Sequence, residues 1–155
     1  MIKIKYLDEC LAKMVKVKKG DLIDLRVSWV EVNGRRYDSI AMEVDYKAGD
    51  IVKIGFGVAM ELPNGYKGCI YPRSSTFKNY GLILTNGVGQ VDNIYCGDED
   101  EWCGMFYALR DGIIGHNERV AQFDISPVYI KEHELKEVEL LGNGNRGGYG
   151  TTGVK

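Results

Sequence analysis

Residues 51–62 read IVKIGFGVAMEL, and this stretch decides the fold. Apolar side chains occupy every second position from Val52 through Ile54, Phe56, Val58 and Met60 to Leu62. A period of two places them on one face of an extended chain, whereas a helix needs a period near 3.6. The stretch therefore predicts β-structure with one buried face.

The same alternation occurs in two other stretches, residues 2–6 and 23–29. Turn signals separate such stretches at short intervals: Asn33-Gly34, Ala48-Gly49-Asp50, Pro63-Asn64-Gly65 and Asp111-Gly112. Short strands with frequent turns are typical of an antiparallel sandwich or jelly roll. We therefore expect an all-β, antiparallel jelly-roll subunit.

Helical signals are few. Ser74 or Ser75 is a candidate cap for a short helix through residues 76–78, which Gly81 would end. Residues 7–15 fit a helical turn or a strand equally well, and the pattern leaves both open. No internal repeat or linker is visible, so we expect one jelly-roll domain over residues 1–141.

The last residues, from Gly142, read GNGNRGGYGTTGVK and lack alternation. Such a segment buries too little apolar area to order itself, so residues 142–155 are predicted to be a mobile arm. One interpretation is a plain flexible tail. The other is an arm that closes over a phosphate-bearing ligand, since its glycines expose backbone N–H groups.

Composition excludes several classes of protein. The chain has 155 residues, 45% of them hydrophobic and 27% charged, which suits a folded domain. A net charge of -2 provides no overall field for nucleic acid or anionic membranes. No apolar run approaches the roughly 20 residues of a membrane helix, and the N-terminus lacks a signal core, so an intracellular protein is expected. The spacing of four cysteines and two histidines argues against zinc.

Three polar clusters stand out, although each alone has an ordinary explanation. Residues 72–75, PRSS, offer a guanidinium and two hydroxyls to phosphate, or simply cap a helix. Residues 86–98 place Asp92 and Tyr95 among glycines, as in a hairpin that faces a planar ligand. Residues 118–122, ERVAQ, by themselves indicate only the start of a strand.

Taken together and in order, these clusters resemble the trimeric dUTP pyrophosphatase (dUTPase) family over nearly the whole chain. The five motifs are matched by residues 20–26, 72–75, 86–97, 118–122 and 146–153. The resemblance implies a Mg²⁺-dependent enzyme that hydrolyses dUTP to dUMP and pyrophosphate, which keeps uracil out of DNA and supplies dUMP for thymidylate synthesis. It also implies a cytoplasmic homotrimer of the bacillus or phage type, with sites shared between subunits and no membrane or nucleic-acid partner.

The resemblance assigns roles to individual residues. Asp92 activates the attacking water, Tyr95 packs on the deoxyribose, and Asp24 holds Mg²⁺ through a water. Uracil is read by the backbone of Gln90, Val91 and Met105 with support from Asn86, while the phosphates fall to Arg73, Ser74, Ser75, Gln122, Arg146, Thr151 and Thr152. The aromatic lid over the base is Tyr149 or Trp102, and the sequence does not choose between them.

The chain departs from the family pattern at three places. Ile94 occupies a position where the family commonly has a second Asp, Tyr149 replaces the usual Phe in a shortened fifth motif, and the acidic stretch 98–102 follows the third motif. One alternative is a dCTP deaminase of the same fold, which the glycine-rich arm disfavours. Another is a regulator that binds a protein through residues 28–45 or 98–101, although such charged segments are usually solvated.

Overall fold

The computed structural model describes residues 1–130 and 134–145. Its elements are β1 (Lys3–Tyr6), β2 (Ile23–Arg26), β3 (Trp29–Val32), β4 (Arg35–Tyr37), β5 (Glu43–Tyr46), β6 (Ile51–Gly55), β7 (Val58–Glu61), β8 (Tyr66–Pro72), α1 (Thr76–Tyr80), β9 (Leu82–Leu84), β10 (Gly89–Val91), β11 (Cys103–Ala108), β12 (Gly112–Gly115) and β13 (Arg119–Pro127).

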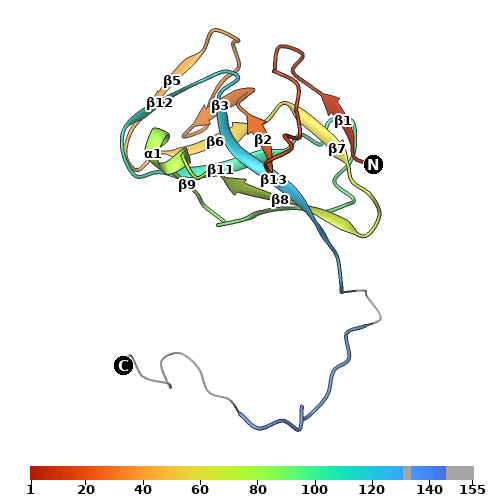
Figure 1. Ribbon diagram of the computed structural model, residues 1–155. Coiled ribbons are helices and arrows are strands. Elements are labelled where there is room, and N and C mark those ends of the chain that lie inside the picture. Colours follow the sequence, from red (N-terminus) through yellow and green to blue (C-terminus); the bar gives the residue numbers. More distant parts are fainter. Residues whose placement is uncertain (131–133, 146–155) are drawn as a thin grey trace.

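The strands form two main sheets, shown in Figure 1. One has the order β10-β8-β13-β2, the other β4-β3-β6-β11-β9, and the pairs β1-β7 and β12-β5 flank them. Every pairing is antiparallel. The predicted all-β, antiparallel fold is confirmed.

The stretch 51–62 forms two strands and not one. β6 joins the five-stranded sheet, β7 pairs with β1, and the chain bends between them at Gly57. Gly57 has φ of +61°, and a Cβ there would lie 2.7 Å from Leu11 Cδ1 and 2.8 Å from Ser28 Cβ. Only glycine fits this close approach in a left-handed conformation. The predicted core face is nevertheless real, because all six alternating apolar residues are buried.

Residues 7–15 form neither a helix nor a strand, and hydrogen bonds to side chains hold them in place. The Asp8 carboxylate accepts from Ser28 Oγ (2.9 Å) and the Cys10 N–H (2.9 Å), and lies 2.7 Å from His116 Nε2. Burial raises the pKa of Asp8, but these hydrogen bonds outweigh it, so the pKa lies below its ordinary value. Asp8 thus fastens the N-terminal segment to the turn before β13.

Helix α1 follows the predicted turn, but its start differs from the prediction. Gly81 ends it in the left-handed conformation, with φ of +68°. Ser75 precedes it without a side-chain cap. The hydroxyl of Thr76 instead accepts from the Arg73 N–H (2.9 Å) and donates to the Val120 carbonyl (2.7 Å). This buried hydroxyl fixes residues 72–76 against β13.

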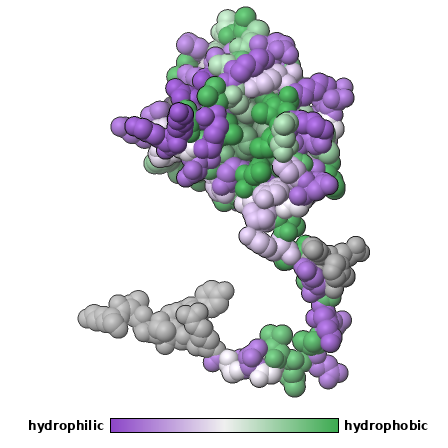
Figure 2. Space-filling view, turned by 45° about the vertical axis from the view of Figure 1, so that its right-hand side comes forward, coloured by the Kyte–Doolittle hydropathy of each residue, from purple (hydrophilic) through white to green (hydrophobic). Residues whose placement is uncertain are grey.

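Beyond β13 the described chain leaves the body of the protein and runs outside it (Figure 1). Its apolar side chains are exposed, and Figure 2 shows hydrophobic surface along it. They are Val128, Tyr129, Ile130, Leu135, Val138, Leu140 and Leu141. Residues 142–145 are exposed as well, while the remainder of the predicted arm lies outside the described residues. Within the described ranges, no helix has the length and apolar character to cross a membrane.

Candidate active site

Two arginines meet one carboxylate where β2, β8 and β13 lie side by side. Arg73 Nε is 2.7 Å from one Asp24 oxygen, and Arg119 Nη1 is 3.3 Å from the other. The register explains the contact, because Gln122 of β13 lies opposite both Asp24 and Tyr71. Two guanidiniums outweigh one carboxylate, so the cluster attracts anions such as phosphate.

The other residues predicted to bind phosphate lie beside this cluster. Gln122 Nε2 donates to the Pro72 carbonyl at 3.1 Å and so braces the turn that carries Arg73. Ser74 is exposed, and Ser75 is half-buried at the start of α1. The structure therefore brings the second and fourth motifs together with Asp24 of the first.

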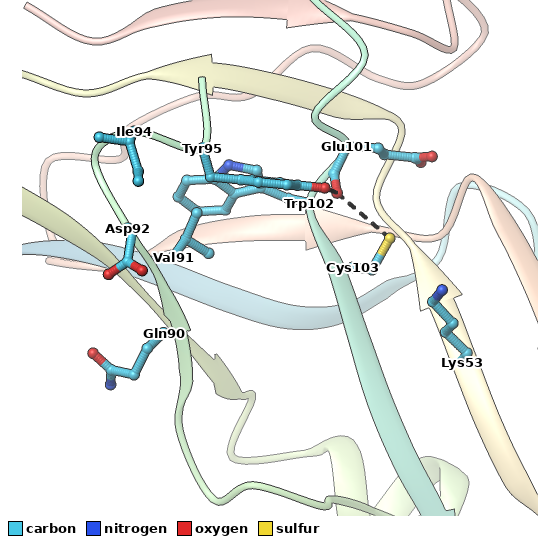
Figure 3. Close-up of a pocket in the computed structure, with 9 residues that line it drawn as sticks. All are labelled: Lys53, Gln90, Val91, Asp92, Ile94, Tyr95, Glu101, Trp102 and Cys103. Atoms are coloured by element: carbon cyan, nitrogen blue, oxygen red, sulfur yellow. Dashed lines mark hydrogen bonds between the residues drawn. The ribbon is translucent and has the colours of Figure 1, made fainter. Parts of the chain in front are cut away.

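A separate cavity of about 510 Å³ lies between the β10 loop and the beginning of β11 (Figure 3). Its lining includes four residues predicted from the third motif, Gln90, Val91, Asp92 and Tyr95. The remaining lining residues are Lys53, Ile94, Glu101, Trp102 and Cys103. The third motif thus forms a pocket, as a hairpin that holds a planar ligand requires.

The loop that carries Asp92 is braced from within. Asn93 Nδ2 lies within 3.3 Å of three carbonyl oxygens, those of Leu62, Pro63 and Tyr66. The Tyr95 N–H donates to the Asp92 carbonyl at 3.0 Å. The Asp92 side chain is exposed, and within residues 1–130 and 134–145 no hydrogen bond or ion pair engages its carboxylate. A fixed backbone with a free carboxylate suits a group that orients water.

Two residues predicted to read the base lie outside the lining of the pocket. The Met105 carbonyl accepts from the Thr85 N–H (2.9 Å) and the Thr85 hydroxyl (3.0 Å). Asn86 is exposed ahead of β10. Cys103, two residues before Met105, lines the pocket instead. The contact of Met105 and Asn86 with the base therefore stays a prediction, since neither residue is in this lining.

Trp102 is a core residue, which does not fit a lid. Its side chain is 1% exposed, and its ring meets Phe123 edge-on at 5.2 Å between ring centroids. A Cβ at Gly68 would lie 2.4 Å from this indole, so the missing side chain makes room for it. Trp102 forms the wall of the pocket. The other lid candidate, Tyr149, lies outside the described residues together with Arg146, Thr151 and Thr152.

Three of the four acidic residues in the stretch 98–101 have side-chain partners within the chain. Asp98 pairs with Lys5 at 3.2 Å, Asp100 accepts from the Gly97 N–H at 2.7 Å, and Glu101 accepts from Trp29 and from the Gly57 N–H. The contacts of Glu101 brace the wall of the pocket, and the other two contacts lie within the loop and between the loop and β1.

Some residues of the site carried no signal in the sequence. Lys53 occupies a polar position in an alternating strand, and Cys103 looks like an ordinary strand residue. Burial and the nearby Glu101 carboxylate raise the pKa of Cys103 to about 11, so its thiol is neutral in the pocket. Arg119 belongs to the fourth motif, where it had no assigned role, and its contact with Asp24 depends on strand register.

Comparisons with known proteins agree with this geometry. No family model matches the chain. It is 45% identical over 154 residues to the SPbeta prophage-derived deoxyuridine 5'-triphosphate nucleotidohydrolase YosS of Bacillus subtilis, with 99% of each chain covered. It is 35% identical over 122 residues to the deoxyuridine 5'-triphosphate nucleotidohydrolase of Desulfitobacterium hafniense, with 75% of this chain and 77% of the relative covered.

Solved structures show the same fold. A mutant of the Staphylococcus bacteriophage 80alpha dUTPase, with dUpNHpp, superposes with a TM-score of 0.75 at 19% identity, with 99% of both chains covered. The Streptococcus mutans dUTPase gives a TM-score of 0.65 at 23% identity, with 84% of this chain and 98% of that chain covered. With a relative 45% identical from end to end, the chain belongs to the deoxyuridine 5'-triphosphate nucleotidohydrolase (dUTPase) family.

Proposed function

We propose that the protein hydrolyses dUTP to dUMP and pyrophosphate, by in-line attack of water on the α-phosphorus. The observation that carries the proposal is the pocket in which Gln90, Val91, Asp92 and Tyr95 meet. The reaction keeps uracil out of DNA and supplies dUMP for thymidylate synthesis. It takes place in the cytoplasm of a bacterium or of a phage-infected host.

The pocket holds the nucleoside end of the substrate. Backbone groups of Gln90 and Val91 read the edge of uracil, and a 5-methyl group or the donor pattern of cytosine fits them poorly. Tyr95 packs against the deoxyribose. Asp92 accepts a proton from the attacking water and orients it, because its carboxylate is exposed on a braced loop.

The cluster of Arg73, Arg119 and Asp24 holds the phosphate end. Arg73 and Arg119 neutralise phosphate oxygens, with Ser74, Ser75 and Gln122 beside them. Mg²⁺ supplies further neutralisation of the triphosphate when it is bound. Asp24 would hold it through a water, and a single protein carboxylate suits an ion that keeps most of its waters.

Distance along β8 argues that each site is shared between subunits. Val91 of β10 lies opposite Gly68 of β8. Arg73 lies five residues after Gly68, so the two positions are roughly 17 Å apart at 3.3 Å per residue. One α-phosphorus cannot contact a water on Asp92 and lie beside these arginines across that distance. A homotrimer, with the base pocket of one subunit next to the phosphate cluster of another, brings the two halves together.

The C-terminal arm completes the shared site. Arg146, Thr151 and Thr152 bind phosphate oxygens, and Tyr149 covers the base. The exposed apolar residues between β13 and the arm favour packing on a neighbouring subunit, since water solvates them poorly. Sedimentation tests the assembly, because an active and stable monomer at assay concentration contradicts a shared site.

The decisive experiment is a turnover assay of the full chain with dUTP, dCTP, dTTP and UTP, with and without Mg²⁺. Release of pyrophosphate from dUTP alone, dependent on Mg²⁺, is the expected result. Release of ammonia from dCTP would instead identify a deaminase of this fold. Equal turnover of all four nucleotides would contradict the base and sugar contacts assigned to the pocket.

A further inference from the structure

The carboxylate of Glu101 is clamped by two donors from outside the pocket. Trp29 Nε1 lies 2.9 Å from both carboxylate oxygens, and the Gly57 N–H donates to one of them at 2.8 Å. These donors come from β3 and from the bend between β6 and β7. Glu101 therefore ties the loop before β11 to two elements of the framework.

Trp29, the principal donor, is itself closely packed. It is 5% exposed, and a Cβ at Gly55 would lie 2.1 Å from its indole, so the ring lies directly on the backbone of β6. The Arg36 guanidinium lies over the Trp29 ring, 4.1 Å from the ring centroid. A ring held in this way presents its N–H in one direction.

The backbone carbonyl of Glu101 connects the clamped side chain to Tyr95 in the pocket. The Tyr95 hydroxyl donates to the Glu101 carbonyl at 3.1 Å, and Figure 3 shows the Tyr95 side chain reaching across the pocket toward Glu101. Burial, with the acidic groups of Cys103, Asp100 and Glu101, raises the pKa of Tyr95, so the phenol remains a donor. Tyr95 is 43% exposed, so packing alone holds it loosely.

We infer that Glu101, clamped by Trp29, is a positioning residue that fixes the Tyr95 ring and so sets the preference for deoxyribose over ribose. The inference rests on the proposed function, in which Tyr95 packs on the sugar. A Tyr95 ring in a fixed position leaves no room for a 2′-hydroxyl. If the Glu101 carbonyl that accepts from its hydroxyl is displaced, the ring can move aside. Selectivity of this kind depends on the rigidity of the residue that excludes the wrong substrate.

The hydrogen bonds from Trp29 and Gly57 need an acceptor oxygen on the side chain of residue 101, and they do not need its negative charge. In Glu101→Gln the amide oxygen can accept from both Trp29 Nε1 and the Gly57 N–H, as one oxygen of Glu101 does now. Glu101→Ala removes the acceptor, and Trp29→Phe removes the principal donor while it keeps a ring beneath Arg36. Glu99→Gln is the matched control, since Glu99 is an exposed acidic residue of the same loop.

The experiment measures kcat/KM for dUTP and for UTP in the full-length variants. We expect the ratio of the two to fall about tenfold or more in Glu101→Ala, to fall less in Trp29→Phe, and to stay within about threefold of wild type in Glu101→Gln. Glu99→Gln should match wild type. In the Tyr95→Phe background, which lacks the phenol, Glu101→Ala should lower the ratio little further.

Each other outcome counts against the inference. A wild-type ratio in Glu101→Ala and Trp29→Phe, even with a lower melting temperature, would make the clamp purely structural. Equal losses in Glu101→Gln and Glu101→Ala would mean that charge, not position, matters. If Glu101→Ala fails to fold, Trp29→Phe alone decides. Absence of dUTP turnover by the wild-type protein overturns the proposed function, whereas turnover with unaltered selectivity in the variants overturns this inference alone.

Discussion

Arg73 Nε lies 2.7 Å from a carboxylate oxygen of Asp24, which joins the second motif of the chain to the first. Arg119 approaches the other oxygen of the same carboxylate from β13. Asp24 therefore orients two guanidiniums toward one place while it reduces their repulsion. A phosphate that enters the cluster meets donors that are already in position, so little reorganisation opposes its binding.

Asp24→Asn keeps the size of the side chain but removes its charge. Because the carboxylate is the predicted partner of a water on Mg²⁺, the Mg²⁺ concentration for half-maximal activity should rise about tenfold or more. A Mg²⁺ titration of dUTP turnover measures this. Asp45→Asn, an exposed substitution on β5, is the control and should leave the titration unchanged. The same Mg²⁺ requirement in both variants would remove Asp24 from the metal site.

Asp92→Asn removes the basicity of the residue that activates water and keeps its shape. The value of kcat should fall about 100-fold or more, while the dissociation constant for dUTP changes little. Single-turnover kinetics and equilibrium binding separate the two quantities. A nearly unchanged kcat would show that another residue activates the water.

Deletion of residues 142–155 tests the arm. Residues 142–145 are exposed, and the segment is too glycine-rich to add much to a core, so the melting temperature should change little. The value of kcat/KM should fall by orders of magnitude, because Arg146 and the backbone amides act on the developing charge. Full activity would mean that the segment is only a tail. A large fall in melting temperature would mean that it is structural.

Substitution of Trp102 tests whether the residue belongs to the core or forms a lid, because only a core residue contributes much to the free energy of unfolding. Trp102→Ala should lower the free energy of unfolding by about 3–5 kcal/mol, since it leaves a cavity beside Phe123 and Gly68. Trp102→Phe should cost less, because within the described residues the buried indole N–H has no hydrogen-bond partner to lose. Chemical denaturation measures both. An unaffected Trp102→Ala protein would contradict the buried position.

Acid should weaken the fastening of the N-terminal segment. The pKa of Asp8 in the folded protein lies below the ordinary 3.8, so ionised Asp8 stabilises the fold above that pH. This contribution is lost as the pH falls through the lowered pKa. The difference in free energy of unfolding between wild type and Asp8→Asn should therefore be full above about pH 4 and should shrink below it. A difference that is constant down to pH 2 would exclude this role.

Local pattern predicted the fold class because burial of one face imposes a period of two on each strand. It did not predict the bend at Gly57, which depends on the approach of Leu11 and Ser28 from elsewhere in the chain. Trp102 is a candidate lid in the sequence because it is the aromatic residue of the extra stretch that follows the third motif. Its burial results from the space at Gly68, a contact that no local pattern contains.

The residues of the site also fall into those that the sequence predicted and those that it did not. The motifs identified Arg73, Gln122 and Asp92, since their residue types and order carry the resemblance. The contact between Asp24 and Arg119 arises from the register of β2 on β13, and Lys53 reaches the pocket through the pairing of β6 with β11. Such neighbours become visible only when the strands are assembled.

The two tryptophans of the chain have a practical consequence. Trp102 lines the base pocket, and Trp29 is bonded to Glu101 of the same lining. With excitation selective for tryptophan, the fluorescence of the protein therefore comes from one residue that lines the pocket and one that is hydrogen-bonded to its lining. Occupation of the pocket by a nucleotide should change the emission without any attached label, and Trp102→Phe leaves Trp29 as a single optical reporter on the Glu101 clamp.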